Sequence, residues 1–348
     1  MKVLVIGGGG REHAVCRKLS ESKDVTELLC APGNAGIARV ARCIPDVKAT
    51  DIDGIVALAK REKVDFVCVT PDDPLALGKG VVVAATIDEA KQAVIEMMQG
   101  GKFGQSGARV LIEECMVGRE VTVLCFCDGK TIVPMKASQD HKRVFDGDKG
   151  PNTGGMGAFA PSPLYTRHIA ERTEREILLP TLRAMNAEGF TFKGVLYVGL
   201  MLTKDGPKVV EYNARFGDPE TQVVLPLLDS DLFAIMRAVR EQRLAEMDIR
   251  WKDGAAACVV LASGGYPGKY EGGKPISGLE EAEAMGATVY HAGTKRTDAG
   301  YVTAGGRVLG VTALGDTLAD AIHKAYAAAE QIHFDGAHMR RDIGKLDM

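Results

Sequence analysis

The sequence is poor in aromatic residues and has no long apolar run. Aromatic side chains make up 5% of the 348 residues, and there is one tryptophan. No segment approaches the roughly 20 apolar residues that a membrane-spanning helix needs, and the opening MKVLVIGGGG is too short in apolar residues for a secretory signal. We therefore expect no membrane partner and a cytoplasmic location.

An excess of one charge and any clustering of cysteine are also missing. The formal net charge is −3, which gives no indication of a nucleic-acid partner. The eight cysteines form no C-x-x-C pair and no zinc-type cluster with histidine. Cys125 and Cys127 fall on one face of the apolar stretch VTVLCFC, so we expect core thiols rather than disulfides or structural zinc.

Two nucleotide-binding fingerprints fail at identifiable positions. A strand over 2–6 leads into Gly7 to Gly10 and a helix, but the last glycine of G-x-G-x-x-G is replaced by Glu12 or His13, depending on the reading frame. A glycine turn at a helix N-terminus still binds anions, so we favour a small phosphorylated ligand over NAD, with a turn that binds nothing as the alternative. The stretch Gly78-Lys79-Gly80 is no Walker A loop, yet it would suit a flap over phosphates or a plain β-turn.

Strands and helices alternate along the first hundred residues. Apolar strands at 2–6, 27–31 and 65–70 each end in turn residues, and a helix is expected over 51–62, which predicts a doubly wound parallel sheet with ligands at its carboxyl edge. Further strands are expected at 81–86 and 109–115, with a helix near 88–99 between them. Glu113 and Glu114 would end the last strand, where they would accept ribose hydroxyls or face water.

Residues 136–157, KASQDHKRVFDGDKGPNTGGMG, form the least regular stretch. A loop this long and this charged is typical of a functional segment, although a mobile surface loop is the alternative. The side chains of interest at its start are Asp140, His141, Lys142 and Arg143. The glycine-rich end from Thr153 to Gly157 would offer backbone N–H groups to an anion.

The stretch KVVEYNARFGDPETQ, residues 208–222, follows an expected helix (166–187) and completes an expected hairpin with GVLYVGLML. Strand alternation places Glu211, Asn213 and Arg215 on one face. Carboxylate and amide oxygens suit Mg²⁺, and a guanidinium suits phosphate or carboxylate; a surface ion pair is the alternative. We expect Asp218 to cap a helix that begins at Pro219.

The quoted motifs together resemble a known family. In this order, GGGGREHA, PGNAG, TPDDPLA, LALGKGVVVA, DHKRVFDGDKGPNTGGMGA and EYNARFGDPETQ are similar to the phosphoribosylamine–glycine ligases, or glycinamide ribonucleotide synthetases, of the ATP-grasp superfamily. The resemblance extends through GRVLGVTALGDTLADA to the terminal RRDIG. It implies an α/β protein with a doubly wound substrate-binding domain (1–76), an α+β ATP-grasp domain (77–253) and a small C-terminal α/β domain (254–348), acting as a monomer on small molecules.

The resemblance also implies roles for individual residues. The phosphoribosylamine pocket corresponds to Gly8, Gly9, Gly10, Arg11 and Asn34. The ATP site corresponds to Gly78, Lys79, Gly80, Glu113 and Glu114, and Mg²⁺ or Mn²⁺ ligands to Glu211 and Asn213. The glycine and acyl-phosphate site corresponds to Asp140, His141, Thr153 and Gly154, with Lys142, Arg143, Arg215 and Asp218 as the groups closest to the chemistry.

One departure from the family lies after residue 76, where PDDPLA passes directly into LALGKG. The family has about two βαβ units there, on the order of 60 to 80 residues, and these include lysines that hold ATP phosphates. Their loss would strip a sheet edge and uncover apolar faces. The expected function is ATP-dependent ligation of glycine to 5-phosphoribosylamine through glycyl phosphate in purine synthesis. The alternative is an impaired or inactive deletion variant that retains ligand or metal binding only.

Overall fold

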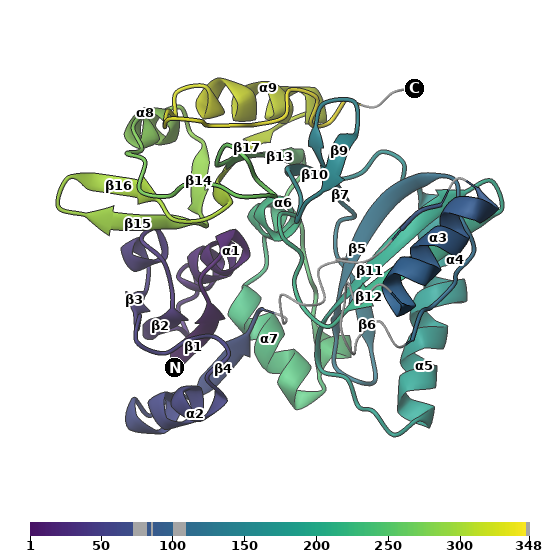
Figure 1. Ribbon diagram of the computed structural model, residues 1–348. Coiled ribbons are helices and arrows are strands. Elements are labelled where there is room, and N and C mark those ends of the chain that lie inside the picture. Colours follow the sequence, from purple (N-terminus) through teal and green to yellow (C-terminus); the bar gives the residue numbers. More distant parts are fainter. Residues whose placement is uncertain (72–81, 85, 100–108, 346–348) are drawn as a thin grey trace.

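A parallel four-stranded sheet forms the amino-terminal part of the protein (Figure 1). The computed structural model describes residues 1–71, 82–84, 86–99 and 109–345. The sheet has the order β3-β2-β1-β4, and its elements are β1 (Lys2–Gly7), α1 (Gly10–Leu19), β2 (Glu27–Pro32), a 3-10 turn (Ile37–Arg39), β3 (Arg42–Cys43), α2 (Ile52–Arg61) and β4 (Phe66–Val69). The predicted parallel α/β unit is confirmed, because apolar strands such as VLVI are fully buried between helices.

Strand β4 is the edge of this sheet in the described part of the chain. Val67 and Val69 are 38% and 67% exposed on it. The strand predicted over 81–86 is wrong for residues 82–84, and the one predicted over 109–115 is also wrong, since both stretches are irregular. Leu111, for example, is 80% exposed and pairs with no strand of the described part of the chain, and a strand forms only against a neighbour.

Helix α3 (Ile87–Met98) matches the expected helix, but it contributes nothing to a core. Its first turn is capped by Thr86, whose hydroxyl accepts from the N–H of Glu89 at 3.2 Å. None of its residues is buried. It lies on the outer side of the molecule in Figure 1, so local capping and periodicity define this helix without packing support.

An antiparallel sheet of order β12-β11-β5-β6 forms the second layer. Its strands are β5 (Arg119–Cys127), β6 (Ile132–Pro134), β11 (Gly194–Thr203) and β12 (Gly206–Asn213), and β11 and β12 make the predicted hairpin. One face packs against α4 (Arg167–Thr173), a π-helical turn (Glu174–Leu178) and α5 (Leu179–Ala187). Cys125 and Cys127 lie in that apolar layer as predicted, and all eight cysteines are free thiols.

The third sheet, of order β14-β17-β13-β10-β7, combines segments from the middle and the end of the chain. Its strands are β7 (Gln139–Asp140), β10 (Gly157–Ala160), β13 (Ala255–Ala262), β14 (Thr288–His291) and β17 (Arg307–Gly315). Helices α8 (Leu279–Ala284) and α9 (Leu318–Ala329) pack on it, and a hairpin joins β15 (Thr294–Thr297) to β16 (Gly300–Thr303). Two strands of the middle segment thus complete the C-terminal sheet.

The stretch expected to be irregular is instead a β-structured arm, here called the arm (residues 139–157). Between β7 and β10 it folds into the hairpin β8 (Arg143–Phe145) and β9 (Lys149–Asn152). The hairpin reverses at Gly147, Asp148 and Gly150, which have φ angles of 66°, 51° and 80°. These left-handed positions suit glycine and aspartate, so the sequence D-G-D-K-G favours a tight turn between two strands.

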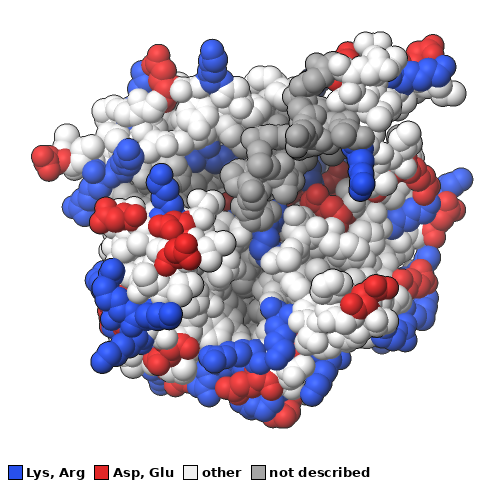
Figure 2. Space-filling view, turned by 60° about the horizontal axis from the view of Figure 1, so that its bottom comes forward, with Lys and Arg blue, Asp and Glu red and all other residues white. Residues whose placement is uncertain are grey.

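A central helical connection joins the three layers. It contains α6 (Thr221–Val224), a 3-10 turn (Leu225–Leu227), α7 (Leu232–Glu241) and a second 3-10 turn (Leu244–Glu246). Residues of α1, of β11 and of β13 share one apolar cluster with it; examples are Val15, Tyr197 and Cys258. The described helices include none that is long and apolar enough to cross a membrane. Lysine, arginine and acidic side chains are mixed over the face drawn in Figure 2.

Candidate active site

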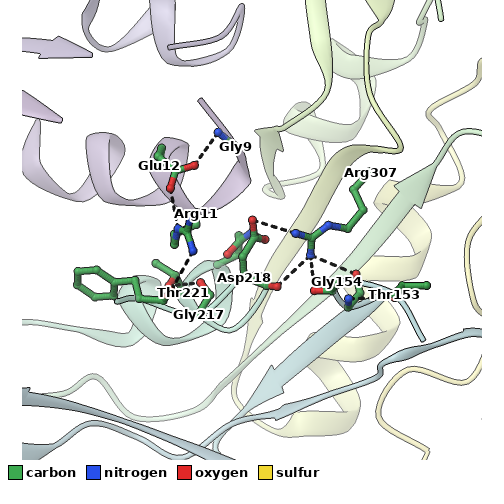
Figure 3. Close-up of polar contacts among 12 residues, drawn as sticks. Gly9, Arg11, Glu12, Thr153, Gly154, Gly217, Asp218, Thr221 and Arg307 are labelled. Atoms are coloured by element: carbon green, nitrogen blue, oxygen red, sulfur yellow. Dashed lines mark hydrogen bonds and ion pairs between the residues drawn. The ribbon is translucent and has the colours of Figure 1, made fainter. Parts of the chain in front are cut away.

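Two arginines from distant parts of the chain meet at one backbone carbonyl. Arg11 Nη1 donates to the carbonyl oxygen of Phe216 at 3.2 Å (Figure 3). Arg215 Nη1 donates to the same oxygen at 3.2 Å. Arg11 is also paired with Glu12 at 2.6 Å, and the Arg215 guanidinium lies 5.5 Å from the centre of the Tyr197 ring. The glycine turn and the RFGDPETQ turn, predicted separately as ligand sites, therefore form one site.

The glycine turn packs directly against the PGNAG loop. A Cβ on Gly8 would lie 2.6 Å from the carbonyl oxygen of Gly33, so only glycine fits there. Asn34 ties the two loops together, because its amide nitrogen donates to the carbonyl of Gly8 at 2.9 Å and to that of His291 at 2.7 Å. The C-terminal part of the chain thus closes over this edge.

The N-terminus of α1 is occupied by its own acidic side chain. Glu12 Oε2 accepts from the N–H of Gly9 at 2.6 Å, and the Glu12 side chain is only 3% exposed. The expectation that the whole glycine turn offers its N–H groups to an anion therefore needs correction, since Gly9 is already engaged. The positive charge available to an anion here is that of Arg11, partly offset by Glu12.

Asp218 joins three segments of the site through side-chain contacts. Its Oδ1 accepts from Gln222 Nε2 at 2.7 Å, and its Oδ2 pairs with Arg307 Nη2 at 3.2 Å (Figure 3). Arg307 Nη1 also donates to the carbonyls of Gly154, at 2.6 Å, and of Asp218, at 2.9 Å. The prediction that Asp218 caps a helix beginning at Pro219 is wrong, because α6 begins at Thr221 and the carboxylate faces Arg307.

The glycine-rich end of the arm does not present free N–H groups. The N–H of Thr153 donates to the carbonyl of Lys142 at 2.7 Å and that of Gly154 to the hydroxyl of Tyr266 at 3.0 Å. The N–H of Gly155 donates to Thr153 Oγ1 at 2.9 Å. The anion-binding role expected of these backbone groups is therefore wrong for this conformation, because their N–H groups bond within the arm and to Tyr266, while the carbonyl of Gly154 accepts from Arg307.

Lys142 lies in a cluster of carboxylates. Its ammonium contacts Glu120 and lies 3.1 Å from Asp140 Oδ1. Burial acts against its charge, yet Asp140 and other neighbours raise the pKa of Lys142 above its ordinary value, so it remains a cation. The cluster thus holds a fixed positive charge beside the carboxylate of Asp140.

Beneath it lies a fully buried acid, Glu220. Its Oε1 is 3.5 Å from the hydroxyl of Thr122, which is 3.0 Å from the Tyr197 hydroxyl. Burial, and then the charge of Asp140, raise the pKa of Glu220 to about 7. This acid can hold or release a proton near neutral pH, next to the arginine side of the site.

The other two side chains expected from the start of the arm point elsewhere. His141 is enclosed beside Phe159, its Nδ1 has no hydrogen-bond partner, and burial lowers its pKa. Arg143 Nη1 donates to the carbonyl of Gly150 at 2.7 Å within the hairpin. Of the four predicted residues, Asp140 and Lys142 therefore belong to the charged cluster with Glu120, and His141 and Arg143 do not.

Glu211 and Asn213 lie side by side at the end of β12, as strand alternation predicts. Asn213 Nδ2 is 3.2 Å from Glu211 Oε1. The described residues contain no group of three or more histidine, cysteine or acidic side chains that could hold a metal. One carboxylate and one amide oxygen nevertheless fit Mg²⁺ that takes its remaining ligands from phosphates and water.

The expected ATP contacts are only partly placed. Gly78, Lys79 and Gly80 lie outside the described residues. Glu113 and Glu114 are exposed in an irregular segment rather than at a strand end, and Glu114 pairs with Lys208 at 2.6 Å. Their role toward a nucleotide stays a prediction.

Several residues of the site were missed at the level of the sequence. Arg307 opens a buried strand of the C-terminal part, 89 residues from its partner Asp218. The others are Glu120, Tyr197 and Glu220. Glu220 lies inside the quoted motif RFGDPETQ. A charged residue among apolar and turn residues was the one feature of the sequence that could have indicated its role.

Comparisons with family models point to one family. Residues 47–221 match the model described as phosphoribosylglycinamide synthetase, ATP-grasp (A) domain. Residues 256–346 match the C domain of the same synthetase. The two matches together cover most of the chain, and the gap between them, residues 222–255, contains most of the central helical connection, including α7.

Curated relatives and solved structures agree with these matches. The chain is 39% identical to a phosphoribosylamine–glycine ligase from Caldanaerobacter subterraneus and 40% identical to one from Rhizobium meliloti, with 99% of this chain and 99% and 98% of the relatives covered. It also matches the crystal structure of phosphoribosylamine–glycine ligase from Thermotoga maritima at 28% identity and a TM-score of 0.78, covering 99% and 100% of the two chains. A biotin carboxylase domain at 13% identity and a TM-score of 0.64 shares the fold.

The alignments are longer than the chain itself. The one with the Caldanaerobacter protein runs over 416 positions, whereas this chain has 348 residues, so at least 68 positions have no residue in this chain. That number falls within the roughly 60 to 80 residues, about two βαβ units, that the sequence predicts to be missing.

Proposed function

This chain belongs to the phosphoribosylglycinamide synthetase family, and from that premise we propose its activity: ATP-dependent ligation of glycine to 5-phosphoribosylamine, which yields glycinamide ribonucleotide, ADP and phosphate. It is an ATP-dependent carbon–nitrogen ligase of purine biosynthesis acting on small molecules. The observation that carries the proposal is the likeness to ligases of about 40% identity over nearly the whole of both chains. We further propose a cytoplasmic monomer.

The reaction needs no nucleophile from the protein. A carboxylate oxygen of glycine attacks the γ-phosphorus of ATP, and the bond to ADP breaks to give glycyl phosphate. The amine of phosphoribosylamine then attacks the acyl carbon, phosphate leaves with the bonding electrons, and the new amide nitrogen loses a proton. Positioning of reactants and compensation of charge provide most of the catalysis in such steps.

The arginine pair is the part of the site best suited to anionic substrates. Arg11 and Arg215 are both oriented by the carbonyl of Phe216, so their positions are fixed before a ligand arrives. We assign Arg11, with Gly8, Gly10 and Asn34, to the phosphoribosylamine side. We assign Arg215, with Asp218, to the glycine and acyl-phosphate side, where a guanidinium binds carboxylate or phosphate in a bidentate manner.

The arm provides the opposite wall of the same site. Lys142 remains charged beside Asp140 and Glu120, and this ammonium would offset charge on the acyl phosphate. Asp140 would face the glycine amine. Thr153 and Gly154 act by holding the arm against Arg307, and His141 and Arg143 support its fold.

Glu211 and Asn213 are the proposed ligands of Mg²⁺ or Mn²⁺. When bound, the metal would neutralise charge on the ATP phosphates. The Asn213 amide contacts the Glu211 carboxylate at 3.2 Å, which places both oxygen-bearing groups together at the exposed end of β12.

A second candidate is a chain that binds ligands without turnover. It is favoured by the 68 or more alignment positions that this chain lacks and by the exposed edge strand β4. The deciding experiment supplies the purified protein with Mg-ATP, glycine and phosphoribosylamine and measures ADP. Release that depends on glycine supports the ligase. No ADP above the glycine-free background, together with binding of ATP, supports the second candidate.

Arg215→Lys tests the residue assignment. Lysine keeps the charge but loses the planar fork, so we expect kcat/KM for glycine to fall by roughly 10- to 100-fold, equivalent to about 1.4–2.7 kcal/mol. Arg167→Lys is the matched control, since Arg167 pairs with Glu171 on an exposed helix face. Full turnover by Arg215→Lys would show that the assigned role is wrong.

A further inference from the structure

The segment from His338 to Gly344, here called the C-terminal strap, lies across the hairpin of the arm. Arg340 at its centre is the largest fully buried side chain in the described part of the chain and is 1% exposed. A buried guanidinium is costly unless each of its donors finds an acceptor. The acceptors that Arg340 uses identify what the strap holds.

Arg340 connects the strap to the first strand and to the turn of the hairpin. Its Nη1 donates to the carbonyl of Arg143 at 3.0 Å and to Asp148 Oδ1 at 2.7 Å. Its Nε and Nη2 form a two-point pair with Asp342 at 2.7 Å each. Asp342 in turn accepts from the N–H of Gly147 at 2.8 Å, so one side chain fixes the start and the turn of the hairpin.

Neighbouring residues of the strap reinforce this attachment. His338 Nε2 lies 2.8 Å from the carbonyl oxygen of Val144, and the N–H of Arg341 donates to Asp146 Oδ1 at 2.7 Å. The strap is anchored on its other side by paired backbone bonds between His338 and Ala262 of β13. The Tyr326 hydroxyl of α9 donates to the carbonyl of Arg340 at 3.0 Å.

We propose that Arg340 is a positioning residue for the ligase reaction, acting through the arm. The carbonyl that it holds belongs to Arg143, the residue directly after Lys142, whose ammonium lies between Glu120 and Asp140. The proposal rests on the assignment of the arm to the glycine side of the site. The C-terminal sheet therefore contributes to substrate binding through the strap, although the strap contacts no substrate.

The test compares Arg340→Lys with Arg341→Lys. Lysine keeps the charge at position 340 but cannot make the forked contacts to Asp342 and the hairpin. Arg341 is a matched control, because its side chain makes an exposed surface pair with Glu330 and its hairpin contact uses only its backbone N–H. Two readouts are needed: amide hydrogen exchange of residues 141–152, and kcat and KM for glycine in the full-length protein.

We expect Arg340→Lys to accelerate exchange in residues 141–152 by tenfold or more, with β5 and β11 unchanged. The KM for glycine should rise by about tenfold, with a smaller change in kcat, because a displaced arm weakens binding. Arg341→Lys should match the parent protein in both readouts. If Arg340→Lys does not fold, Asp148→Asn, which removes the charge of one exposed acceptor of Arg340, should give the same pattern at smaller amplitude.

Unchanged exchange in the arm, or acceleration spread equally over the whole protein, would overturn the proposal. Faster exchange with an unaltered KM for glycine would overturn it as well, since the strap would then hold the arm without positioning substrate. If the parent protein shows no glycine-dependent turnover, the proposed function fails, whereas the exchange comparison by itself still decides whether Arg340 holds the arm.

Discussion

Replacement of Arg307 should destabilise the protein well beyond the loss of a surface arginine. Arg307→Met keeps the aliphatic stem but removes the ion pair with Asp218 and the hydrogen bonds to the carbonyls of Gly154 and Asp218. Removal of one partner of a buried pair typically costs about 3–5 kcal/mol. Because these side chains are 21% and 18% exposed, we expect about 2–4 kcal/mol here.

The free energy of unfolding can be measured by urea denaturation followed by fluorescence. Trp251 is the single tryptophan and packs against the apolar cluster shared by the three layers, so its emission reports the part of the protein that Arg307 joins. Asp218→Asn and the double variant complete a cycle, in which we expect a coupling of about 1–2 kcal/mol.

Arg296→Met is the control, since Arg296 lies in β15 with its guanidinium over the ring of Tyr301 at 5.7 Å. It should change stability by less than about 1 kcal/mol. A value for Arg307→Met no larger than this, or a coupling near zero with Asp218→Asn, would refute the reasoning that this arginine joins the C-terminal sheet to the site.

Two further predictions concern pH. Burial and Asp140 raise the pKa of Glu220 to about 7 from a model-compound value of 4.5, so its contribution to stability is complete below pH 4.5 and is lost as the pH rises through 7. At pH 8 the free energy of unfolding of Glu220→Gln should therefore exceed that of the parent by about 2–3 kcal/mol. Urea denaturation of both proteins at pH 5 and pH 8 measures this difference, and equal pH dependence of the two proteins would contradict the prediction. Burial lowers the pKa of His291 to about 4, and burial together with the charge of His291 lowers the pKa of His13 to about 3. The free energy of unfolding that these neutral histidines contribute is therefore present above pH 6.5 and is lost as the pH falls toward these pKa values. Between pH 7.5 and 5 the melting temperature of His291→Gln should fall less than that of the parent, whereas the melting temperature of His168→Gln, changed at an exposed histidine, should fall as much as that of the parent. An equally steep fall in His291→Gln would exclude the buried pair as the cause.

Local patterns predicted the elements that are stabilised by their own packing. The strand over 2–6 and the helix after it were predictable because an apolar run and a glycine turn determine them locally. The strand predicted over 109–115 was wrong because strand formation depends on a neighbour, and Leu111 and Ile112 remain 80% and 81% exposed. Sequence composition reports the preference of a segment and says nothing about the partner that it pairs with.

The candidate site divides in the same way. Glu211 and Asn213 were predictable because strand alternation brings neighbours two apart together. Arg307 was not, since its contact with Asp218 spans 89 residues and two layers. Glu220 was passed over because only the fold shows that a carboxyl in a turn motif is fully buried beside Thr122 and Tyr197.

The contact between Asn34 and His291 has a consequence for biosynthesis. The two residues are 257 apart in the sequence, so at about 5–20 residues per second a ribosome needs roughly 13 to 50 s to supply the second after the first. During that interval the inner face of α1, where Val15 and Leu19 are fully buried in the finished protein, has no cover from β14 of the C-terminal sheet. We therefore expect the amino-terminal layer to expose apolar surface on the ribosome until the C-terminal sheet is made.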